Sequence, residues 1–556
     1  MNICGSNLEL AKKLQEHMEE KRNGKGAGMS AAIIIDGKLV AACAIGTRGM
    51  DNSAADITDL YNVGSVSKVY CAAAIMKLVE MGLVDLDAPV CKYLPRFVMR
   101  DPRYKDITVR MTLCHSSGLP GSSYKKMMVN KWMGNDITEE NYEYWRNSKL
   151  KADPGAFSVY CNEGFELAVA IIEEVTGKKY IDFLRDNITT PAGALSTAVG
   201  DMDTNGRVMM SAKGKKPEYI RAIGAGGIRT DIADCARFGW IFIEPNGIFT
   251  SESINEMCKP QGKTFLKEDN FTPLYGLGWD CVNFTSDSVY LGPGVLTKGG
   301  STGQFSSELI VCPKYRVSAA ISSTHDCETK NLELLCELIA IALKEERGID
   351  VFTKKEKPVY VAKPVPADWS ERFSGFYYSY MGILKVSVEN DKLTVMLYDG
   401  AGWIPQKRFF PLPFEWNGEF FFNSDSTLRF ERYNDCVYLK VYTPILGCEI
   451  PMAQKFERKV PVSDGWKKRI GKKYIGVNLS ASDEDAAVLS GLTIRQFDDS
   501  GILLFANSVA GSSEFFTTFG VSCGDDETDM CLDTPGMGSR DLTTFFAYVK
   551  DGIEYI

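Results

Sequence analysis

The sequence predicts a mixed α/β domain followed by two small antiparallel all-β domains. Strand-like and helix-like patterns alternate over the first 350 residues, whereas beyond residue 366 the helical period disappears and hairpins take over. The length of 556 residues points the same way, since a domain usually holds about 100–200 residues. We therefore expect one domain at 1–350, a linker at 351–366, an antiparallel β-barrel or sandwich at 367–458 and a second antiparallel β domain at 459–556.

The elements of the first domain follow from their periodicity. Residues 1–28 carry charges at helical spacing, which indicates an amphipathic helix and not the apolar core of a secretory signal. Residues 29–46 predict a hairpin, because two apolar runs flank the turn pair Asp36 and Gly37. Apolar spacing then predicts helices over 65–82, 163–176 and 332–346, and strands over 304–313 and 317–322.

The rest of the chain reads as linker and hairpins. Residues 353–366 contain four lysines and three prolines, which favour an extended linker. Beyond it, alternating apolar residues surround turn pairs, as antiparallel hairpins require. The turn pairs are Asn390-Asp391 within 384–397, Asn434-Asp435 within 428–441, and Ser500-Gly501 within 492–505.

Composition excludes several classes of function. The net charge of −9 gives no basic footprint for nucleic acid or an anionic membrane, and no run of about 18 apolar residues predicts a membrane span. The sixteen cysteines are dispersed without a C-x-x-C pair, which favours free buried thiols and a cytoplasmic location. With only His17, His115 and His325, we expect no histidine-rich metal site and no cofactor.

A candidate nucleophile stands at the start of the helix expected at 65–82. Ser65 and Lys68 fit the pattern S-x-x-K, and positions i and i+3 share one helix face, so the amine can reach the hydroxyl. The helix N-terminus would also favour negative charge on that oxygen. The pattern alone is weak, because it also starts at Ser122, Ser123 and Ser148, and a lone match is usually a helix cap beside a solvated lysine.

Two further motifs follow in order. Tyr160-Cys161-Asn162 opens the helix expected at 163–176, and Lys298-Gly299-Gly300 precedes a predicted strand. With these motifs the sequence resembles the serine β-lactamase-like, penicillin-binding-protein-like family of the class C type, including D-aminopeptidases of three domains. Similar stretches lie at 86–90, 107–120, 226–228 and 275–279, and the resemblance covers about residues 25–345. It implies an antiparallel sheet flanked by helices.

The resemblance also implies roles for the motif residues. Ser65 would form an acyl-enzyme, Lys68 and Tyr160 would move the proton, and Asn162 would orient a substrate amide. Burial and a second nearby cation would lower the pKa of a lysine enough to make it a base. Which of Lys68 and Tyr160 is the base stays open.

The third motif would bind substrate. Lys298 and Gly300 would line the pocket, and the backbone N–H groups of Ser65 and Ser301 would form the oxyanion hole. Lys298 as a pocket cation would favour substrates with a carboxylate near the scissile bond. Gly299, however, stands where K-T-G enzymes carry a hydroxyl, so efficient β-lactamase activity is not expected.

A competing pattern involves the same stretch. Residues 299–303 fit the nucleophile elbow G-x-S-x-G, which would make Ser301 the nucleophile and His325 its base. That elbow needs a helix after it, but a strand is predicted there. His115 is expected to hold backbone groups by hydrogen bonds and not to catalyse.

The leading interpretation is a serine amidase or peptidase acting on short peptides or amides that contain D-amino acids. The alternatives are an esterase of small esters, a weak β-lactamase, or a sensor or scaffold that binds a ligand without hydrolysis. The β domains are expected to restrict access to the cleft without supplying catalytic groups. The expected partner is a small molecule or short peptide, with neither nucleic acid nor membrane, and a homo-oligomer stays open.

Overall fold

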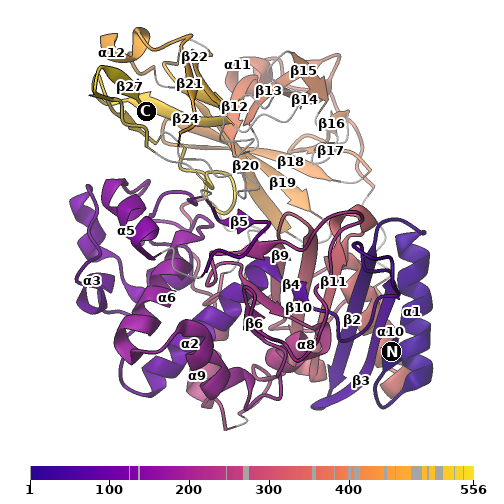
Figure 1. Cartoon of the computed structure of the whole chain (residues 1–556). Coiled ribbons are helices and arrows are strands. Elements are labelled where there is room, and N and C mark those ends of the chain that lie inside the picture. Colours follow the sequence, from indigo (N-terminus) through magenta and orange to yellow (C-terminus); the bar gives the residue numbers. More distant parts are fainter. Residues whose placement is uncertain are drawn as a thin grey trace.

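The computed structural model describes most of the chain (Figure 1). The residues outside the description are 1, 124–125, 135–137, 246, 267–274, 354–358, 381, 399–401, 406–409, 411–412, 425, 444–447, 458, 478–490, 498–499, 508–516, 531 and 542–543. Part of the expected linker, residues 354–358, therefore lies outside it.

The first part of the chain is built on a six-stranded sheet in which every neighbouring pair is antiparallel. The strand order is β1-β3-β2-β11-β10-β9, so strands from the two ends of this part meet at β2 and β11, and β9 forms an edge. The bounds are β1 Ile3–Cys4, β2 Gly28–Ile35, β3 Lys38–Gly46, β9 Leu296–Ser301, β10 Phe305–Cys312 and β11 Val317–Thr324. An antiparallel sheet flanked by helices is the fold class that the sequence predicted.

Helices cover both faces of this sheet because successive strand residues point to opposite sides. Ala31 and Ile33 of β2 pack with helices α1 (Leu8–Arg22) and α10 (Asn331–Arg347), whereas Ala32 and Ile34 belong to the core on the other face. That second core includes α2 (Ser67–Glu80), α6 (Glu163–Thr176) and α8 (Ile232–Trp240). Figure 1 shows α1 and α10 beside β2 and β3, with α2 and α6 away from them.

The predicted local signals are confirmed in this part. Asp36 and Gly37 both adopt positive φ, at 49° and 76°, which is the backbone of a two-residue hairpin turn. The helix expected at 65–82 begins as a 3₁₀ turn, Gly64–Val66, and continues as α2. Within its described residues, the first part of the chain also contains five further α-helices and five short strands. These are α3 Val90–Tyr93, α4 Val109–Leu113, α5 Thr138–Asn147, α7 Tyr180–Leu184, α9 Ser251–Cys258, β4 Tyr61–Asn62, β5 Met128–Val129, β6 Ala198–Val199, β7 Tyr219–Ile220 and β8 Ile228–Thr230.

The next part is a β-barrel that follows α11 (Trp369–Phe373). Its strands run in the order β13-β12-β20-β19-β18-β17-β16-β14-β15, and a further pairing of β13 with β14 closes all of them except β15 into a ring. The expected turns at Asn390-Asp391 and Asn434-Asp435 join β13 to β14 and β18 to β19. The bounds are β12 Gly375–Ser379, β13 Gly382–Glu389, β14 Lys392–Tyr398, β15 Trp403–Pro405, β16 Phe414–Trp416, β17 Phe421–Phe422, β18 Thr427–Tyr433, β19 Cys436–Thr443 and β20 Cys448–Phe456.

The last part holds α12 (Asp464–Lys467) and a five-stranded sheet in the order β21-β22-β23-β24-β25. Its strands are β21 Lys473–Ile475, β22 Gly491–Gln496, β23 Leu503–Asn507, β24 Thr517–Ser522 and β25 Thr528–Asp529, with a separate hairpin of β26 Tyr548–Lys550 and β27 Ile553–Tyr555. The hairpin expected over 492–505 is formed by β22 and β23; its Ser500-Gly501 turn is described, while 498–499 are not.

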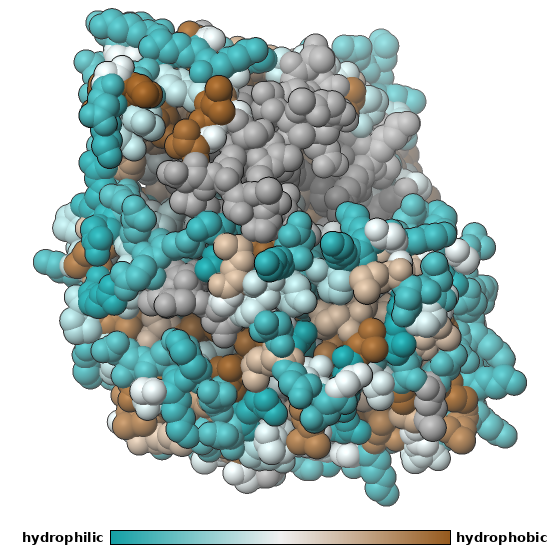
Figure 2. Space-filling model, viewed as in Figure 1, coloured by the Kyte–Doolittle hydropathy of each residue, from teal (hydrophilic) through white to brown (hydrophobic). Residues whose placement is uncertain are grey.

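The visible surface is largely polar. Among the coloured residues, the face in Figure 2 is mostly hydrophilic, with hydrophobic residues in small groups between hydrophilic ones. Within the described ranges, no helix is long and apolar enough to cross a membrane.

Candidate active site

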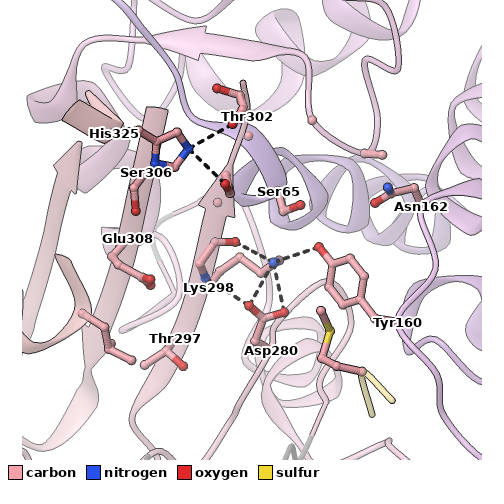
Figure 3. Close-up of a pocket in the computed structure, with 18 of the residues that line it drawn as sticks. Ser65, Tyr160, Asn162, Asp280, Thr297, Lys298, Thr302, Ser306, Glu308 and His325 are labelled. Carbon is pink, nitrogen blue, oxygen red and sulfur yellow. Dashed lines mark hydrogen bonds and ion pairs between the residues drawn. The ribbon is translucent and has the colours of Figure 1, made fainter. Parts of the chain in front are cut away.

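A cavity of about 1020 Å³ lies at the β9 edge of the six-stranded sheet (Figure 3). Residues from all three parts of the chain line it. The first part contributes the three motifs, the barrel contributes Cys448 and Ile450, and the last part contributes Met537 and Arg540. The motif residues in its wall are Ser65, Tyr160, Asn162, Lys298, Gly299, Gly300 and Ser301.

Ser65 and Lys68 form a hydrogen-bonded pair at the start of α2. The Lys68 Nζ lies 3.0 Å from the Ser65 Oγ and donates a second hydrogen bond of 2.7 Å to the carbonyl of Ala225. Lys68 is completely buried, and burial lowers its pKa, as does the charge of Lys298, although Tyr160 opposes this shift. A lysine in this state is able to take the proton of the serine hydroxyl.

Tyr160 lies between two amines. Its hydroxyl accepts a 3.4 Å hydrogen bond from the Lys298 Nζ, and the Lys68 Nζ lies 4.9 Å from the centroid of its ring. Burial alone would raise the pKa of Tyr160, but the charges of Lys298, Lys68 and Arg540 together lower it. The surrounding positive charges thus make Tyr160 easier to deprotonate than an ordinary tyrosine.

The Lys298 ammonium already donates three hydrogen bonds within the protein. Its ammonium lies 3.0 Å from the carboxylate of Asp280 and 2.7 Å from the carbonyl of Gly299, in addition to the Tyr160 hydroxyl. A lysine has three N–H donors, so these three contacts use them all. Burial would lower the pKa of Lys298, but Asp280 and Tyr160 raise it, so the amine stays charged. An ion pair with Asp280 leaves little free charge for a substrate carboxylate.

Two glycines allow β9 to approach the turn that carries Ser65. Gly64 has a φ of 53°, and a side chain there would place its Cβ 2.7 Å from the Ser301 nitrogen. A Cβ at Gly300 would lie 2.0 Å from the Val63 carbonyl oxygen and 3.1 Å from the Ser65 nitrogen. The backbone amides expected to form an oxyanion hole therefore lie on directly adjoining segments.

Asn162 is held in place by the C-terminal part. Its Nδ2 donates a 2.7 Å hydrogen bond to the Ser122 hydroxyl, which in turn donates 3.0 Å to a carboxylate oxygen of Asp541. The side chain lines the cavity wall near Tyr160 (Figure 3). The β domains were expected only to restrict access, but the last part also supports a motif residue.

The expected structural role of His115 is confirmed. Its Nδ1 accepts a 3.0 Å hydrogen bond from the backbone nitrogen of Cys161, and its ring stacks on Tyr160 with centroids 4.4 Å apart. Burial lowers the pKa of His115 well below its usual value, and the charges of Lys68 and Lys298 lower it further. A neutral imidazole thus orients the Tyr160-Cys161-Asn162 motif.

The other S-x-x-K matches form no hydrogen bond between their serine and lysine side chains within the described residues. Lys126, in the match that starts at Ser123, pairs with Glu140, and the Ser148 hydroxyl donates to the carbonyl of Tyr144. The match from Ser122 ends at residue 125, which lies outside the described residues.

The competing elbow is only partly formed. The Ser301 Oγ lies 3.3 Å from the His325 Nε2, within the same cavity wall. Ser301, however, ends β9, and the next element, after three connecting residues, is strand β10 and not a helix. His325 Nε2 also lies 3.0 Å from the Thr302 carbonyl, and that contact requires the nitrogen to be a donor. The same nitrogen cannot then accept the serine proton.

Sequence reasoning missed several residues of the site. Asp280 balances Lys298, and Glu166 accepts hydrogen bonds of 3.1 and 2.9 Å from the backbone nitrogens of Gly224 and Ala225. Glu308 faces Gly299 across the strands, and a Cβ on Gly299 would lie only 3.0 Å from its carboxylate. None of these acidic residues belongs to a recognisable short motif, so periodicity and spacing had no signal for them.

Comparison with known proteins agrees with this geometry. The Beta-lactamase family model matches residues 10–344. The chain is 26% identical to the D-alanyl-D-alanine-carboxypeptidase/endopeptidase AmpH of Escherichia coli K12 over 55% of its own length and 82% of that protein. It is 28% identical to penicillin-binding protein 4 of Amycolatopsis lactamdurans over 57% and 87% of the two chains.

A solved structure resembles most of the molecule. The octameric penicillin-binding protein homologue from Pyrococcus abyssi superimposes with a TM-score of 0.51 at 22% identity, covering 80% of this chain and 99% of that one. This likeness concerns the fold. The family match over more than half of the chain shows that the protein belongs to the Beta-lactamase family of serine hydrolases.

Proposed function

We propose that the protein is an amidase or peptidase that hydrolyses short peptides or amides containing D-amino acids through an acyl-enzyme on Ser65. The observation that carries this proposal is the buried Lys68 amine, 3.0 Å from the Ser65 hydroxyl and beside Tyr160. This arrangement offers a nucleophile and two adjoining groups for its proton, which are the parts that acyl transfer requires.

Acylation would begin with attack of the Ser65 oxygen on the substrate carbonyl. The hydroxyl proton moves to the Lys68–Tyr160 pair, and the carbonyl oxygen becomes an oxyanion stabilised by the backbone N–H groups of Ser65 and Ser301. When the intermediate collapses, the C–N bond breaks and the amine leaves with the proton returned from the pair. Tyr160, which also contacts Lys298, is placed to pass that proton on.

Deacylation would reverse these steps with water. The Lys68–Tyr160 pair takes one proton from water, the hydroxide attacks the ester carbonyl, and the same proton returns to the Ser65 oxygen. The product acid then leaves the cavity. No metal or cofactor takes part in this scheme.

In this proposal the enzyme prefers substrates that carry a neutral amide near the scissile bond over substrates that carry a carboxylate there. Lys298 has its three donors committed, and Glu308 stands beside Gly299 where a K-T-G enzyme would carry a hydroxyl. Burial raises the pKa of Glu308 to about 8, and Asp280 adds to this shift while Lys298 opposes it. A polar acid and a saturated lysine offer poor recognition of a carboxylate, which supports amide over carboxypeptidase specificity.

The preference for D-amino acids rests on similarity. One relative is named a D-alanyl-D-alanine-carboxypeptidase/endopeptidase, and it matches over 82% of its length. We further propose a cytoplasmic enzyme that forms a homo-oligomer; the dispersed cysteines support the location, and the octameric structural neighbour supports assembly. Cell fractionation and light scattering would test these two points.

The test is labelling followed by turnover. A fluorophosphonate probe should label the wild type on Ser65 and leave Ser65→Ala unlabelled. The wild type is then assayed with D- and L-aminoacyl amides, matched dipeptides and small esters. Turnover of D-amides above L-amides and esters supports the proposal, faster esters would indicate an esterase, and labelling without any turnover would indicate a sensor.

A further inference from the structure

The last part of the chain returns to the catalytic motifs after strand β25. The backbone nitrogen of Tyr160 donates to the Gly536 carbonyl, and the Gly536 nitrogen donates to the Ser158 carbonyl, both at 2.8 Å. These reciprocal bonds form a parallel β-bridge between Val159 and Gly536. The motif that carries Tyr160 is therefore partly built by residues almost 400 positions further along the chain.

The barrel anchors this returning segment. The Gln454 side chain on β20 accepts hydrogen bonds from the Asp533 nitrogen at 2.8 Å and from the Thr534 hydroxyl at 2.6 Å. Thr534 is fully buried. These two hydrogen bonds to one amide oxygen, one of them buried, give the segment a defined position relative to the cavity.

Arg540 is the charged side chain that the segment brings to the cavity. Its guanidinium lies 4.9 Å from the centroid of the Tyr160 ring, while its Nε lies 2.7 Å from a carboxylate oxygen of Asp541. Asp541 accepts hydrogen bonds from the nitrogen and hydroxyl of Ser122, the partner of Asn162. Asp541 thus holds Arg540 while it supports the Tyr160-x-Asn162 motif.

Three basic side chains therefore surround one phenol ring. Lys68 reaches it from α2 at 4.9 Å, Lys298 from β9 at 5.3 Å, and Arg540 from the returning segment at 4.9 Å. The other titratable groups that influence Tyr160 are Asp280, the stacked neutral His115 and the buried Tyr275. Lys298 pairs with Asp280 and Arg540 pairs with Asp541, so both cations act on the ring from within ion pairs.

We propose that Arg540 is a positioning residue of the active site, supplied by the C-terminal part, which stabilises the deprotonated, base-competent form of the Lys68–Tyr160 pair. Arg540 neither gains nor loses a proton in acylation; it acts through the ring beneath it. This inference rests on the proposed acylation of Ser65. It does not depend on which member of the pair is the base, because the charge of Arg540 lowers the pKa of both.

The experiment compares full-length variants by the rate at which a fluorophosphonate probe labels Ser65 between about pH 5.5 and about pH 9.5. Arg540→Gln removes the charge, and Arg540→Lys keeps it. The matched control is Arg469→Gln, because Arg469 also lies over an aromatic ring, 5.1 Å from the centroid of Trp466, and pairs with Asp526 and Glu554 in the same part of the chain.

In Arg540→Gln the probe should label Ser65 on the order of tenfold more slowly near neutral pH. The acidic limb of the curve of labelling rate against pH should move to higher pH, and the rates of variant and wild type should converge at the alkaline end. Arg540→Lys should recover most of the rate, and Arg469→Gln should leave the profile in place. The proposal is overturned if Arg540→Gln leaves the limb unmoved, or lowers the rate by the same factor at every pH as a loss of structure would.

A second measurement separates this inference from the proposed function. If the wild type is not labelled at Ser65, the function fails, but the ionisation of Tyr160 is still observable by NMR with ring-labelled tyrosine, assigned with Tyr160→Phe. Arg540→Gln should then shift the Tyr160 titration to higher pH relative to Arg469→Gln. An unchanged titration refutes the role of Arg540 whatever the reaction is.

Discussion

Substituting Lys298 distinguishes two roles of the third motif: binding a substrate carboxylate, or providing a charge beside Tyr160. If the ammonium bound a substrate carboxylate, Lys298→Ala would penalise carboxylate-bearing substrates beyond their neutral amides by about 1.5–3 kcal/mol, or roughly ten- to a hundredfold in kcat/KM. In the structure its donors are committed to Asp280, the Gly299 carbonyl and Tyr160. We therefore expect the same loss on both kinds of substrate.

The size of that shared loss follows from the geometry. A unit charge about 3.4 Å from the Tyr160 oxygen contributes at most about 5 kcal/mol at an effective dielectric constant of about 20. Relaxation and water entering the gap would reduce this, so a loss of roughly 10²–10³ in kcat/KM is expected, within the usual range for general acid–base groups.

The assay measures kcat/KM for a D-aminoacyl dipeptide and for its C-terminal amide. Asp280→Asn is the informative companion variant, since it keeps an amide oxygen that can accept from Lys298 but removes the balancing charge. It should raise the ratio of dipeptide to amide activity by about tenfold, the value of one charged hydrogen bond. The reasoning is refuted if Lys298→Ala penalises the dipeptide far more than the amide, or if Asp280→Asn leaves the ratio unchanged.

Four further outcomes are expected. Ser301→Ala should keep most of its labelling at Ser65, whereas mass spectrometry showing the adduct on residue 301 of the wild type would favour the elbow with His325. Lys68→Ala and Tyr160→Phe should each lower turnover by about 10²–10⁴, and near-full activity of Tyr160→Phe would remove it from the mechanism. Met537→Ala should raise activity on long relative to short substrates, because Met537 lines the cavity wall contributed by the C-terminal part, and an unchanged ratio would argue against restricted access. Burial raises the pKa of Glu166 from 4.5 to about 8, so the unfolded protein ionises this group at lower pH than the folded protein, and stability falls as pH rises through this window. Glu166→Gln should therefore lose less stability than the wild type from about pH 5 to about pH 8, measured by urea unfolding. An equal or steeper loss would contradict the assignment.

Local elements were predictable because their causes are local. The turn pair Asp36-Gly37, the helix that ends before Gly177 and the turn at Asn390-Asp391 each reflect backbone preferences of a few adjacent residues. The burial pattern along β2 likewise follows from side chains that alternate between two covered faces. Closure of the barrel did not follow, because it needs the pairing of β12 with β20, which lie far apart in the chain, whereas hairpin signals define only sequence neighbours.

The sequence by itself determined the order of the catalytic motifs, the pairing of Ser65 with Lys68 on one helix face, and the α/β and all-β character of the parts. These depend on spacings of a few residues. Only the tertiary structure decided that Asp280 neutralises Lys298, that Glu308 stands beside Gly299, and that Arg540 reaches the Tyr160 ring. The charges that determine which form of Tyr160 is stable come from segments remote in the chain, and their distances exist only once those segments pack together.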